Sequence, residues 1–397
     1  MASDEARDAR VRIPRDAQAD YTEDMAQTRR RFLKEQAGAD LTNVATYSLS
    51  PQSLPGNVEN FIGVAQVPIG LAGPLRINGE AAAGDFYIPM ATTEGTLVAS
   101  YSRGSRVISE SGGVKTTVVK EAMQRAPVFL FEDARQARDF SDWLSQNFDL
   151  VKAAAETSTS VGKLIEIQQF PAGPNLYTRF NFTTGDAAGQ NMTGKATYVA
   201  CEALKDLYPK TVRYLLSGSM DTDKKHSYAN SLLTRGRRVI AEVILSADVL
   251  QNRLGVRPEQ LIKARQVHLL GSIMSGVAYQ GAHAANGLAA LFIATGQDAA
   301  NVAESHAGYS YAQITDAGDF YWSVTLPALI VGTYGGGTGL ATQRECLELL
   351  GCYGAGKARK FAEICAATVL AGDVSLAGAV LAGDWVTSHD QLGRNRP

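Results

Sequence analysis

Four short polar segments interrupt otherwise apolar or glycine-rich sequence, and each carries one group that can do chemistry. These groups are a carboxylic acid at Glu94, an ammonium at Lys224, a carboxylate at Asp298 and an imidazole at His389. Singly, each segment fits an ordinary structural role such as a helix cap or a solvated turn. Together, the four groups form the set needed to polarise a carbonyl and to move protons to oxygen and sulfur. We therefore treat them as candidates for one acid–base site.

Residues 127–216 are the clearest of the units that could position such a site, because their apolar pattern alternates between strand and helix periods. The expected elements are a strand over 127–131, a helix from the region of 137 to about 155, strands over 163–169 and 175–182, a helix over 190–205 and a strand over 211–216. This β-α-β-β-α-β order predicts a ferredoxin-like unit. The unit is self-contained, so we expect it to be an insertion in a larger domain.

The remaining chain predicts an α+β protein in three parts. Residues 1–58 form a tail and a small helical element, whose helix begins after Thr22 and ends near Gln36. Residues 59–126 and 217–397 form a large α/β substrate-binding domain, which the 127–216 unit interrupts. The apolar stretch 269–296 is rich in Gly and Ala and is interrupted by polar residues. It predicts a buried central helix rather than a membrane span.

Composition narrows the function classes. The 397 residues are 45% hydrophobic and 20% charged with a net charge of −2, which is typical of a soluble enzyme and gives no positive field for nucleic acid. The four cysteines form no C-x-x-C pair and no two histidines have metal-ligand spacing, so no metal site is expected. The first thirty residues lack an apolar signal segment, and we expect a reduced, cytoplasmic setting.

Two local patterns imitate other functions. The segment 351–357 resembles a phosphate-binding loop, but Ala358 stands where a magnesium-binding hydroxyl belongs and the segment follows a helical pattern. The alternation NLYTRFNF (175–182) could form an RNA-stacking sheet, but no basic stripe surrounds it. We expect core packing for these aromatic side chains.

Six motifs in order resemble the 3-hydroxy-3-methylglutaryl-coenzyme A (HMG-CoA) reductase family. They are ENFIGVAQVPIGLAGPL (59–75), IPMATTEGTLVAS (88–100), SGSMDTDKK (217–225), GAHAAN and GQDAANV within 281–302, GTYGGGT (332–338) and VTSHDQLGR (386–394). The resemblance covers the chain from about residue 20 to residue 394. Its details are similar to the class I-like, NADPH-using enzymes of archaea and eukaryotes, here without a membrane anchor.

The resemblance implies a role for each chemical group. Glu94 would donate a proton to the carbonyl oxygen, Lys224 would stabilise the developing oxyanion, and Asp298 would hold both in a hydrogen-bonded network. His389 would protonate the departing coenzyme A thiolate. The substrate-contacting residues that it implies are Arg125, Ser217, Asp223, Lys225, Asn286, Glu59 and Asn60.

The resemblance also makes the ferredoxin-like unit the dinucleotide domain and NADPH the cofactor, with NADH as the alternative. The implied cofactor residues are Asp186, Gly189, Gln190, Asn191, Lys163, Gly335, Gly336, Gly337 and Thr338. The sequence departs from the family pattern in three places, one of which is the cofactor motif, where Ala188 and Gln190 replace the two methionines. Val267 and His268 stand where the family usually has a lysine, and Lys163 is the only cation in the segment expected to read the 2′-phosphate.

The expected activity is reduction of HMG-CoA to mevalonate and coenzyme A by two hydride transfers, in the mevalonate pathway of isoprenoid biosynthesis. The expected partners are HMG-CoA and NADPH, with no nucleic acid and no membrane, in a homodimer or higher homo-oligomer whose active sites lie at subunit interfaces. Two alternatives stay open: NAD-dependent oxidation of mevalonate, and a non-enzymatic ferredoxin-like protein that binds RNA or another ligand.

Overall fold

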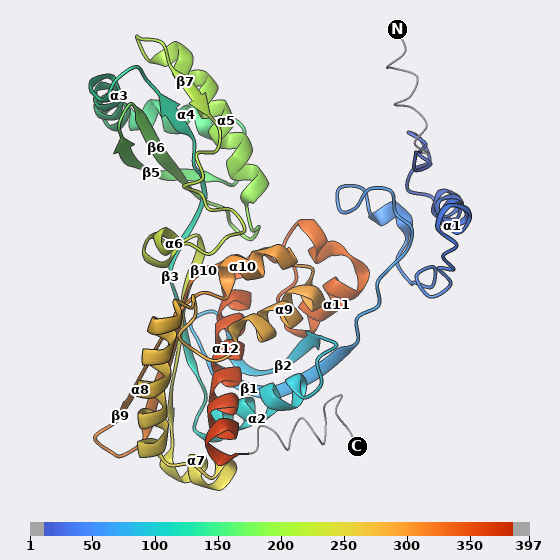
Figure 1. The fold of residues 1–397 in the computed structure, drawn as a ribbon, viewed down its shortest axis with the longest axis vertical. Coiled ribbons are helices and arrows are strands. Elements are labelled where there is room, and N and C mark those ends of the chain that lie inside the picture. The colour runs from blue at the N-terminus through green and yellow to red at the C-terminus, as the bar shows by residue number, and fades with distance from the viewer. Residues whose placement is uncertain (1–11, 384–397) are drawn as a thin grey trace.

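Three parts of different construction are joined in the computed structural model, which describes residues 12–383 (Figure 1). A long lower body carries a smaller upper lobe, and an N-terminal element lies to one side. The N-terminal element contains α1 (Glu23–Ala37) and the 3₁₀ helix η2 (Pro51–Ser53). As the sequence predicted, the Thr22 side chain accepts the Met25 N–H to begin α1, and Gly38 ends it at φ 65°.

The lower body combines a two-stranded hairpin, an antiparallel sheet and most of the helices. Its strands are β1 (Ile69–Asn78), β2 (Ala83–Ala91), β3 (Lys115–Arg125), β8 (Gly236–Leu245), β9 (Tyr309–Ile314) and β10 (Phe320–Leu329). Its helices are α2 (Leu97–Glu110), α6 (Tyr228–Leu233), α7 (Ala247–Leu254), α8 (Pro258–Ser275), α9 (Ala284–Thr295), η3 (Ala299–Asn301), α10 (Val302–Ser305), η4 (Gly336–Gly339), α11 (Ala341–Leu349) and α12 (Ala358–Ala382). β1 pairs with β2, and β3-β8-β10-β9 form the main sheet.

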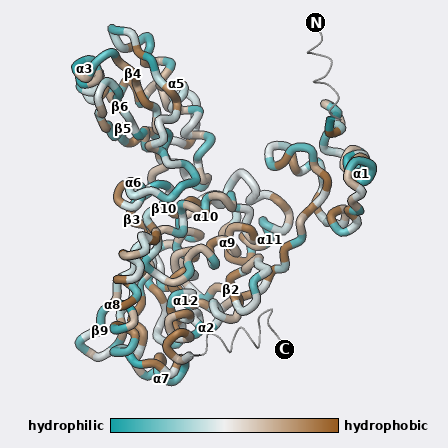
Figure 2. Tube along the Cα trace, in the orientation of Figure 1, coloured by the Kyte–Doolittle hydropathy of each residue, from teal (hydrophilic) through white to brown (hydrophobic). Residues whose placement is uncertain are grey.

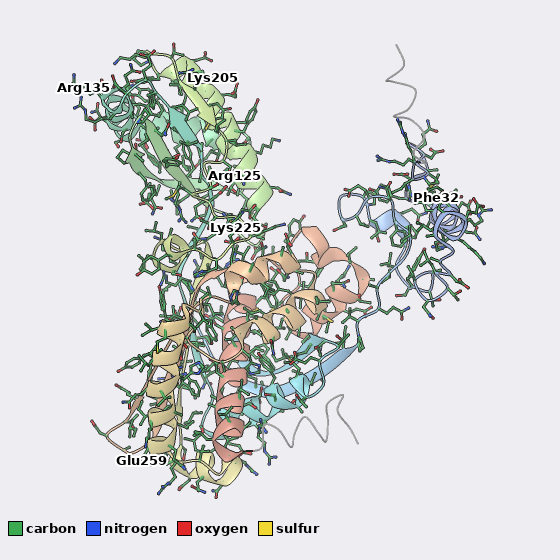
Figure 3. All side chains as sticks on the ribbon, viewed as in Figure 1. Phe32, Arg125, Arg135, Lys205, Lys225 and Glu259 are labelled. Carbon is green, nitrogen blue, oxygen red and sulfur yellow. The ribbon has the colours of Figure 1, made fainter. Side chains whose placement is uncertain are left out.

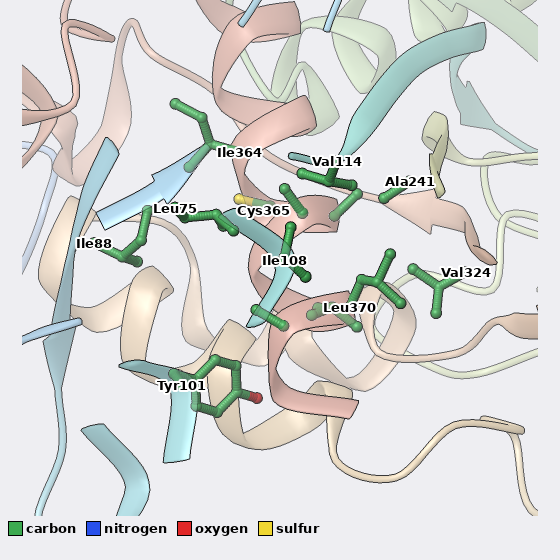
Figure 4. Close-up of a cluster of buried hydrophobic side chains, with 14 of the residues drawn as sticks. Leu75, Ile88, Tyr101, Ile108, Val114, Ala241, Val324, Ile364, Cys365 and Leu370 are labelled. Carbon is green, nitrogen blue, oxygen red and sulfur yellow. The ribbon is translucent and has the colours of Figure 1, made fainter. Parts of the chain in front are cut away.

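The buried central helix is α12, which corrects the expectation that residues 269–296 would supply it. α12 is apolar on all sides and packs against α2, α9 and the main sheet, with Cys365 and Leu370 among its fully buried residues (Figures 2 and 4). α12 is also the one described helix long and apolar enough to cross a membrane. However, 78% of its most apolar window is buried inside the protein, as in the core helix of a globular domain.

Residues 269–296 are not one helix. They comprise the end of α8, a turn and then α9, and only α9 is largely buried. The apolar side chains Val267, Leu270, Ile273 and Met274 of α8 are instead 60–79% exposed in the single chain. Exposed apolar faces of this kind are typical of contact surfaces.

The upper lobe contains the elements predicted for residues 127–216. They are β4 (Val128–Leu130), α3 (Ala134–Gln146), α4 (Phe148–Glu156), β5 (Lys163–Ala172), β6 (Asn175–Thr183), α5 (Gln190–Leu207) and β7 (Arg213–Leu215). The expected first helix is broken at Asn147, which ends α3 and begins α4. Phe180 and Phe182 are fully buried, so the aromatic alternation is core packing.

Strand β3 joins the lobe to the body. Its first part, Lys115 to Ala122, pairs with β8, and its last residues, Met123 to Arg125, pair with β6 of the lobe. The lobe strands follow the order β7-β4-β6, with β5 on the other edge of β6, and all neighbours are antiparallel. The two sheets are therefore continuous, and the candidate site lies at this junction, where Figure 3 labels Arg125 and Lys225.

Candidate active site

The loop 217–225, between β7 and α6, carries most of the candidate residues and has an unusual backbone. Ser219, Thr222 and Lys224 all have left-handed φ angles, of 67°, 54° and 57°. Residues with a Cβ adopt this region at a cost, and such conformations persist where the surroundings enforce them. The loop is thus a built structure rather than a solvated turn.

Lys224 and Asp298 meet directly. Lys224 Nζ lies 2.8 Å from Asp298 Oδ2, and the side chains are 45% and 43% exposed. This hydrogen bond raises the pKa of Lys224 above its ordinary value, so the ammonium stays charged. Asp298 is itself fixed, because its Oδ1 accepts the Ala300 N–H at 3.0 Å at the start of η3. The pair places a held cation at a solvent-accessible position.

Glu94 lies in the loop after β2 and points toward the first turn of α9. Its Oε1 accepts from Asn286 Nδ2 at 3.4 Å, a long contact by hydrogen-bond standards. Among the described residues, no ion pair or hydrogen bond joins Glu94 to Lys224 or Asp298. The structure thus brings together the Lys224–Asp298 half of the expected network, and it seats Glu94 beside Asn286.

A second cation lies at the same junction. Arg125 Nη1 is 3.0 Å from Asp221 Oδ2 and 4.0 Å from Asp223 Oδ2. The Ser217 hydroxyl is 3.4 Å from both oxygens of Asp221, which is only 2% exposed. Lys225 Nζ donates to the Asp223 carbonyl at 3.1 Å. The candidate substrate contacts Arg125, Ser217, Asp223 and Lys225 are therefore neighbours.

Two buried charged residues that contact the 217–225 loop were not predicted from the sequence. Arg235 and Glu304 are each 1% exposed and form an ion pair of 2.9 Å. Arg235 Nη2 also lies 2.8 Å from Asp223 Oδ1. The available signal was weak: each charge sits in a short segment with no recognised motif.

A cavity of about 480 Å³ opens beside Asn286. Residues of α8, of the 277–283 turn and of the start of α9 line it, together with His268, His283 and His306. His268 Nε2 contacts the Gly281 carbonyl at 3.2 Å, and His283 Nε2 contacts that of Gly372 at 2.9 Å. The α8 residues that line this cavity are His268, Gly271, Ser272 and Ser275, which differ from the exposed apolar residues of the same helix.

The cofactor candidates gather where α5 meets the glycine loop. Gly189 ends the preceding turn at φ 88°, and the first turn of α5 carries no acidic residue. The N-terminus of a long helix attracts phosphate. Gln190 Nε2 donates to Asp223 Oδ1 at 2.9 Å, which connects this turn to the lysine loop. Asn191 follows on the exposed surface.

The Asp186 carboxylate binds main-chain N–H groups of the protein, which is not the environment expected of a residue that contacts a ligand. Its carboxylate accepts the N–H groups of Gly356, Lys357 and Ala358 at 2.7, 3.0 and 3.0 Å, at the N-terminus of α12. Burial raises the pKa of Asp186, but these three donors outweigh it, and the pKa lies below its ordinary value. Thus the segment 351–357, which resembles a phosphate-binding loop in sequence, binds the Asp186 carboxylate of the protein itself.

The glycine loop is packed tightly against the aspartate motif. A Cβ on Gly296 would lie 2.3 Å from the Gly337 carbonyl oxygen, so the two backbones need glycine to approach. The Gln297 side-chain amide donates to the Gly332 carbonyl and accepts its N–H, at 2.9 and 2.8 Å. Gly335 and Gly336 have positive φ, and Thr338 is buried within η4.

Three candidates stand apart from this cluster. Lys163, on β5, is 54% exposed and is paired with Glu156 at 3.2 Å. Glu59 and Asn60 belong to the segment that packs beside α1, where Arg29 donates to the Phe61 carbonyl at 3.3 Å. His389 lies outside the described residues.

Comparison with known proteins shows which family has a similar sequence. The family model of hydroxymethylglutaryl-coenzyme A reductase matches residues 25–394. The 3-hydroxy-3-methylglutaryl-coenzyme A reductase of Pyrococcus abyssi is 44% identical over 92% of this chain and 92% of its own length. That of Methanocaldococcus jannaschii is 43% identical over 92% of both chains.

A solved structure has a similar fold. It is the class II 3-hydroxy-3-methylglutaryl-CoA reductase of Streptococcus pneumoniae bound to NADPH in open conformations, with a TM-score of 0.67 and 21% identity. The match covers 89% of this chain and 86% of that one. A family match over nearly the whole sequence agrees with the paired lysine and aspartate at the lobe junction, and the chain belongs to the hydroxymethylglutaryl-coenzyme A reductase family.

Proposed function

We propose that this protein reduces HMG-CoA to mevalonate and coenzyme A, using two NADPH, as an enzyme of the mevalonate pathway. The observation that best supports this proposal is the ion pair between Lys224 Nζ and Asp298 Oδ2, which are 2.8 Å apart. Lys224 belongs to a loop with several left-handed residues, between the two parts that would hold cofactor and substrate. Family membership supplies the reaction class. The pair supplies a reason why this chain can perform it.

The residues present fit the proton and charge movements of such a reaction. Reducing a thioester to an alcohol develops negative charge on the carbonyl oxygen at each of two reductions. A preorganised ammonium lowers the energy of that charge, which is the part we assign to Lys224, held by Asp298. Glu94 lies beside Asn286, which lines the cavity, and would supply the proton to that oxygen.

Between the two reductions, coenzyme A must leave as a thiol. We assign its protonation to His389, because the imidazole is the side chain whose pKa best suits acid catalysis near neutral pH. Arg125, Ser217, Asp223, Lys225 and Asn286 would bind the hydroxymethylglutaryl group, with Glu59 and Asn60 as further contacts.

We infer that residues 127–216 form a ferredoxin-like dinucleotide-binding domain. The strand order β7-β4-β6-β5 with antiparallel neighbours supports this inference. NADPH would supply the hydride. The uncapped start of α5, with Gly189 and Asn191, fits its phosphates, and Lys163 fits the 2′-phosphate. Gln190 and the loop Gly335–Thr338 would lie along it, while Asp186 would act by fixing the turn to α12.

The assembly we propose is a homodimer or larger, with active sites at the subunit boundary. The exposed apolar face of α8 supports this proposal, because a partner packed on that face would lie beside the helix that also lines the cavity. The large substrate domain is then residues 59–126 and 217–397, and residues 1–58 form the N-terminal element. We place the enzyme in the cytoplasm, in keeping with four free, buried cysteines.

We assign the enzyme to the class I-like group. The chain shares 44% identity with an archaeal reductase and 21% with the class II structure of similar fold.

One assay with purified protein tests the proposed function. We expect oxidation of NADPH that depends on HMG-CoA and forms mevalonate. Turnover only from mevalonate with NAD would favour the catabolic alternative, and no turnover in either direction would favour a binding protein.

A further inference from the structure

Glu304 is a buried carboxylate directly beneath the lysine loop, and the reaction described above gives it no part. It comes from α10, 80 residues along the chain from Lys224, and its side chain is 1% exposed. Its Oε1 accepts the main-chain N–H of Lys224, and its Oε2 accepts from Asn230 Nδ2 at 3.3 Å. One carboxylate therefore contacts the backbone of the catalytic lysine itself.

Arg235 supplies the charge that makes this burial tolerable. Its Nε lies 2.9 Å from Glu304 Oε2, and its Nη2 lies 2.8 Å from Asp223 Oδ1. The first contact is an ion pair without hydrogen-bond alignment, since Arg235 Nε has no hydrogen-bond partner among the described residues. Buried charges require such pairing. Arg235 thus contacts Asp223, and Glu304 contacts the next residue, Lys224.

The loop needs an external hold. Ser219, Thr222 and Lys224 all have left-handed φ, which residues with a Cβ adopt only at a cost relative to ordinary backbone. A loop left to itself would relax toward right-handed or extended conformations. The Lys224 ammonium would then move away from Asp298, because its direction follows from its main-chain dihedrals.

We propose that Glu304 is a positioning residue for the reductive site: as a carboxylate, it holds the Lys224 main chain in the left-handed conformation that directs the ammonium to Asp298 and the reacting carbonyl. The inference rests on the proposed function, because it presumes that Lys224 acts on a carbonyl.

The electrostatics around Glu304 give this hold a pH dependence. Burial raises the pKa of Glu304 to about 7, and Arg235 and the Lys224 N–H oppose that rise. The other charged or titratable groups around Glu304 are Asp223, Arg179 and the Lys224 ammonium, together with Lys225 and His226, which line the same small cavity, and His306 at the end of α10. Burial and then His306 lower the pKa of His226, so it is largely neutral at this pH.

The direction in which activity changes with pH follows from the charge on Glu304. As pH falls through about 7, Glu304 takes up a proton and its grip on the loop weakens, so kcat falls. The sign for stability is opposite. A folded-state pKa above the unfolded value contributes stability that is fully present below about 4.5 and is lost as pH rises through about 7.

Glu304→Gln is the direct test, because the groups that contact the Glu304 oxygens are all donors and a glutamine offers one oxygen and one NH₂. We expect kcat at about pH 8 to fall by roughly 10- to 100-fold with both HMG-CoA and free mevaldehyde. The KM for NADPH should stay within about twofold, since the cofactor turn is untouched. Mevaldehyde matters because it has no thiol to expel, which removes His389 from the pH profile.

The matched control is Glu363→Gln. Glu363 is also 1% exposed and accepts from Ala81 N, Ala82 N and Thr116 Oγ1 at 2.8–3.0 Å, remote from the lysine loop. Its loss should lower the melting temperature while kcat stays within about twofold. Equal losses of kcat in the two variants would reduce Glu304 to a structural role.

Glu304→Asp keeps the charge and serves if the glutamine variant fails to fold. We expect an intermediate kcat that still falls at low pH, whereas Glu304→Gln should lose that dependence. A kcat within twofold of wild type for whichever variants fold, or a wild-type mevaldehyde profile that is flat through pH 7, would overturn the inference. A wild-type protein that reduces neither substrate at any pH would instead overturn the proposed function.

Discussion

The two halves of the site are held in contrasting ways. On the substrate side, Lys224 sits on a loop clamped by Arg235 and Glu304, both 1% exposed. On the proposed cofactor side, Lys163 is 54% exposed, and it pairs with Glu156, which is 18% exposed. Exposed pairs contribute about 0–1 kcal/mol, whereas breaking a buried one costs several. In the proposed site, the contrast teaches that the firmest hold lies where negative charge would develop in the reaction, and that the cation proposed for cofactor recognition is left adaptable.

The largest expected effect belongs to the leaving-group step. His389→Gln should lower HMG-CoA reduction by roughly 10²–10⁴-fold, the range for losing a general acid, and should spare much of the reduction of free mevaldehyde. Steady-state kinetics on both substrates, with NADPH binding as the fold control, would measure it. Equal losses on both substrates would reassign His389 to binding, and no loss on either would remove it from the site.

Lys224→Ala probes the rigid half itself. We expect a loss of roughly 10²–10³-fold, as for removing one preorganised donor, and an equal loss with HMG-CoA and mevaldehyde because both pass through an oxyanion. The same two-substrate kinetics would show it. A variant that loses only thioester reduction would contradict this assignment.

Asp186→Asn tests whether the cofactor turn is held by α12. Its carboxylate accepts the main-chain N–H groups of Gly356, Lys357 and Ala358 at the N-terminus of α12, and these donors lower its pKa against the effect of burial. Because the folded pKa is depressed, its stabilising contribution is present above the unfolded pKa and is lost as pH falls through the folded one.

We expect the Asp186 variant to lose about 1 kcal/mol of unfolding free energy near neutral pH, a discounted figure for a half-exposed group. Chemical denaturation at neutral and acidic pH would measure it. A difference from wild type that does not shrink at acidic pH would count against the helix contact as the source.

Lys163→Ala should give the smallest change in activity, and it tests the proposed cofactor side of the site. We expect kcat/KM for NADPH to fall by about 3- to 10-fold and that for NADH to change little, since an exposed cation contributes up to about 1 kcal/mol. Glu156→Gln is its counterpart: freeing Lys163 from its partner should favour NADPH further. Parallel losses with both cofactors would assign Lys163 to the lobe's structure.

The same contrast explains what could be predicted from the sequence. The lobe elements and α1 follow from local periodicity and caps such as Thr22, and the structure confirms them within a few residues, apart from the break at Asn147. The hold on Lys224 could not be predicted, because Glu304 and Arg235 reach it through tertiary packing rather than spacing. Likewise, α12 and 269–296 look equally apolar, and only packing shows that α12 fills the core.

The stoichiometry of NADPH oxidised per mevalonate formed tests the central claim most directly. If Lys224 and its partners serve both reductions of one bound substrate, purified protein supplied with limiting HMG-CoA and excess NADPH will oxidise two NADPH for each mevalonate and release one coenzyme A. One NADPH oxidised per HMG-CoA with mevaldehyde as the product, or no oxidation at all, would contradict the account.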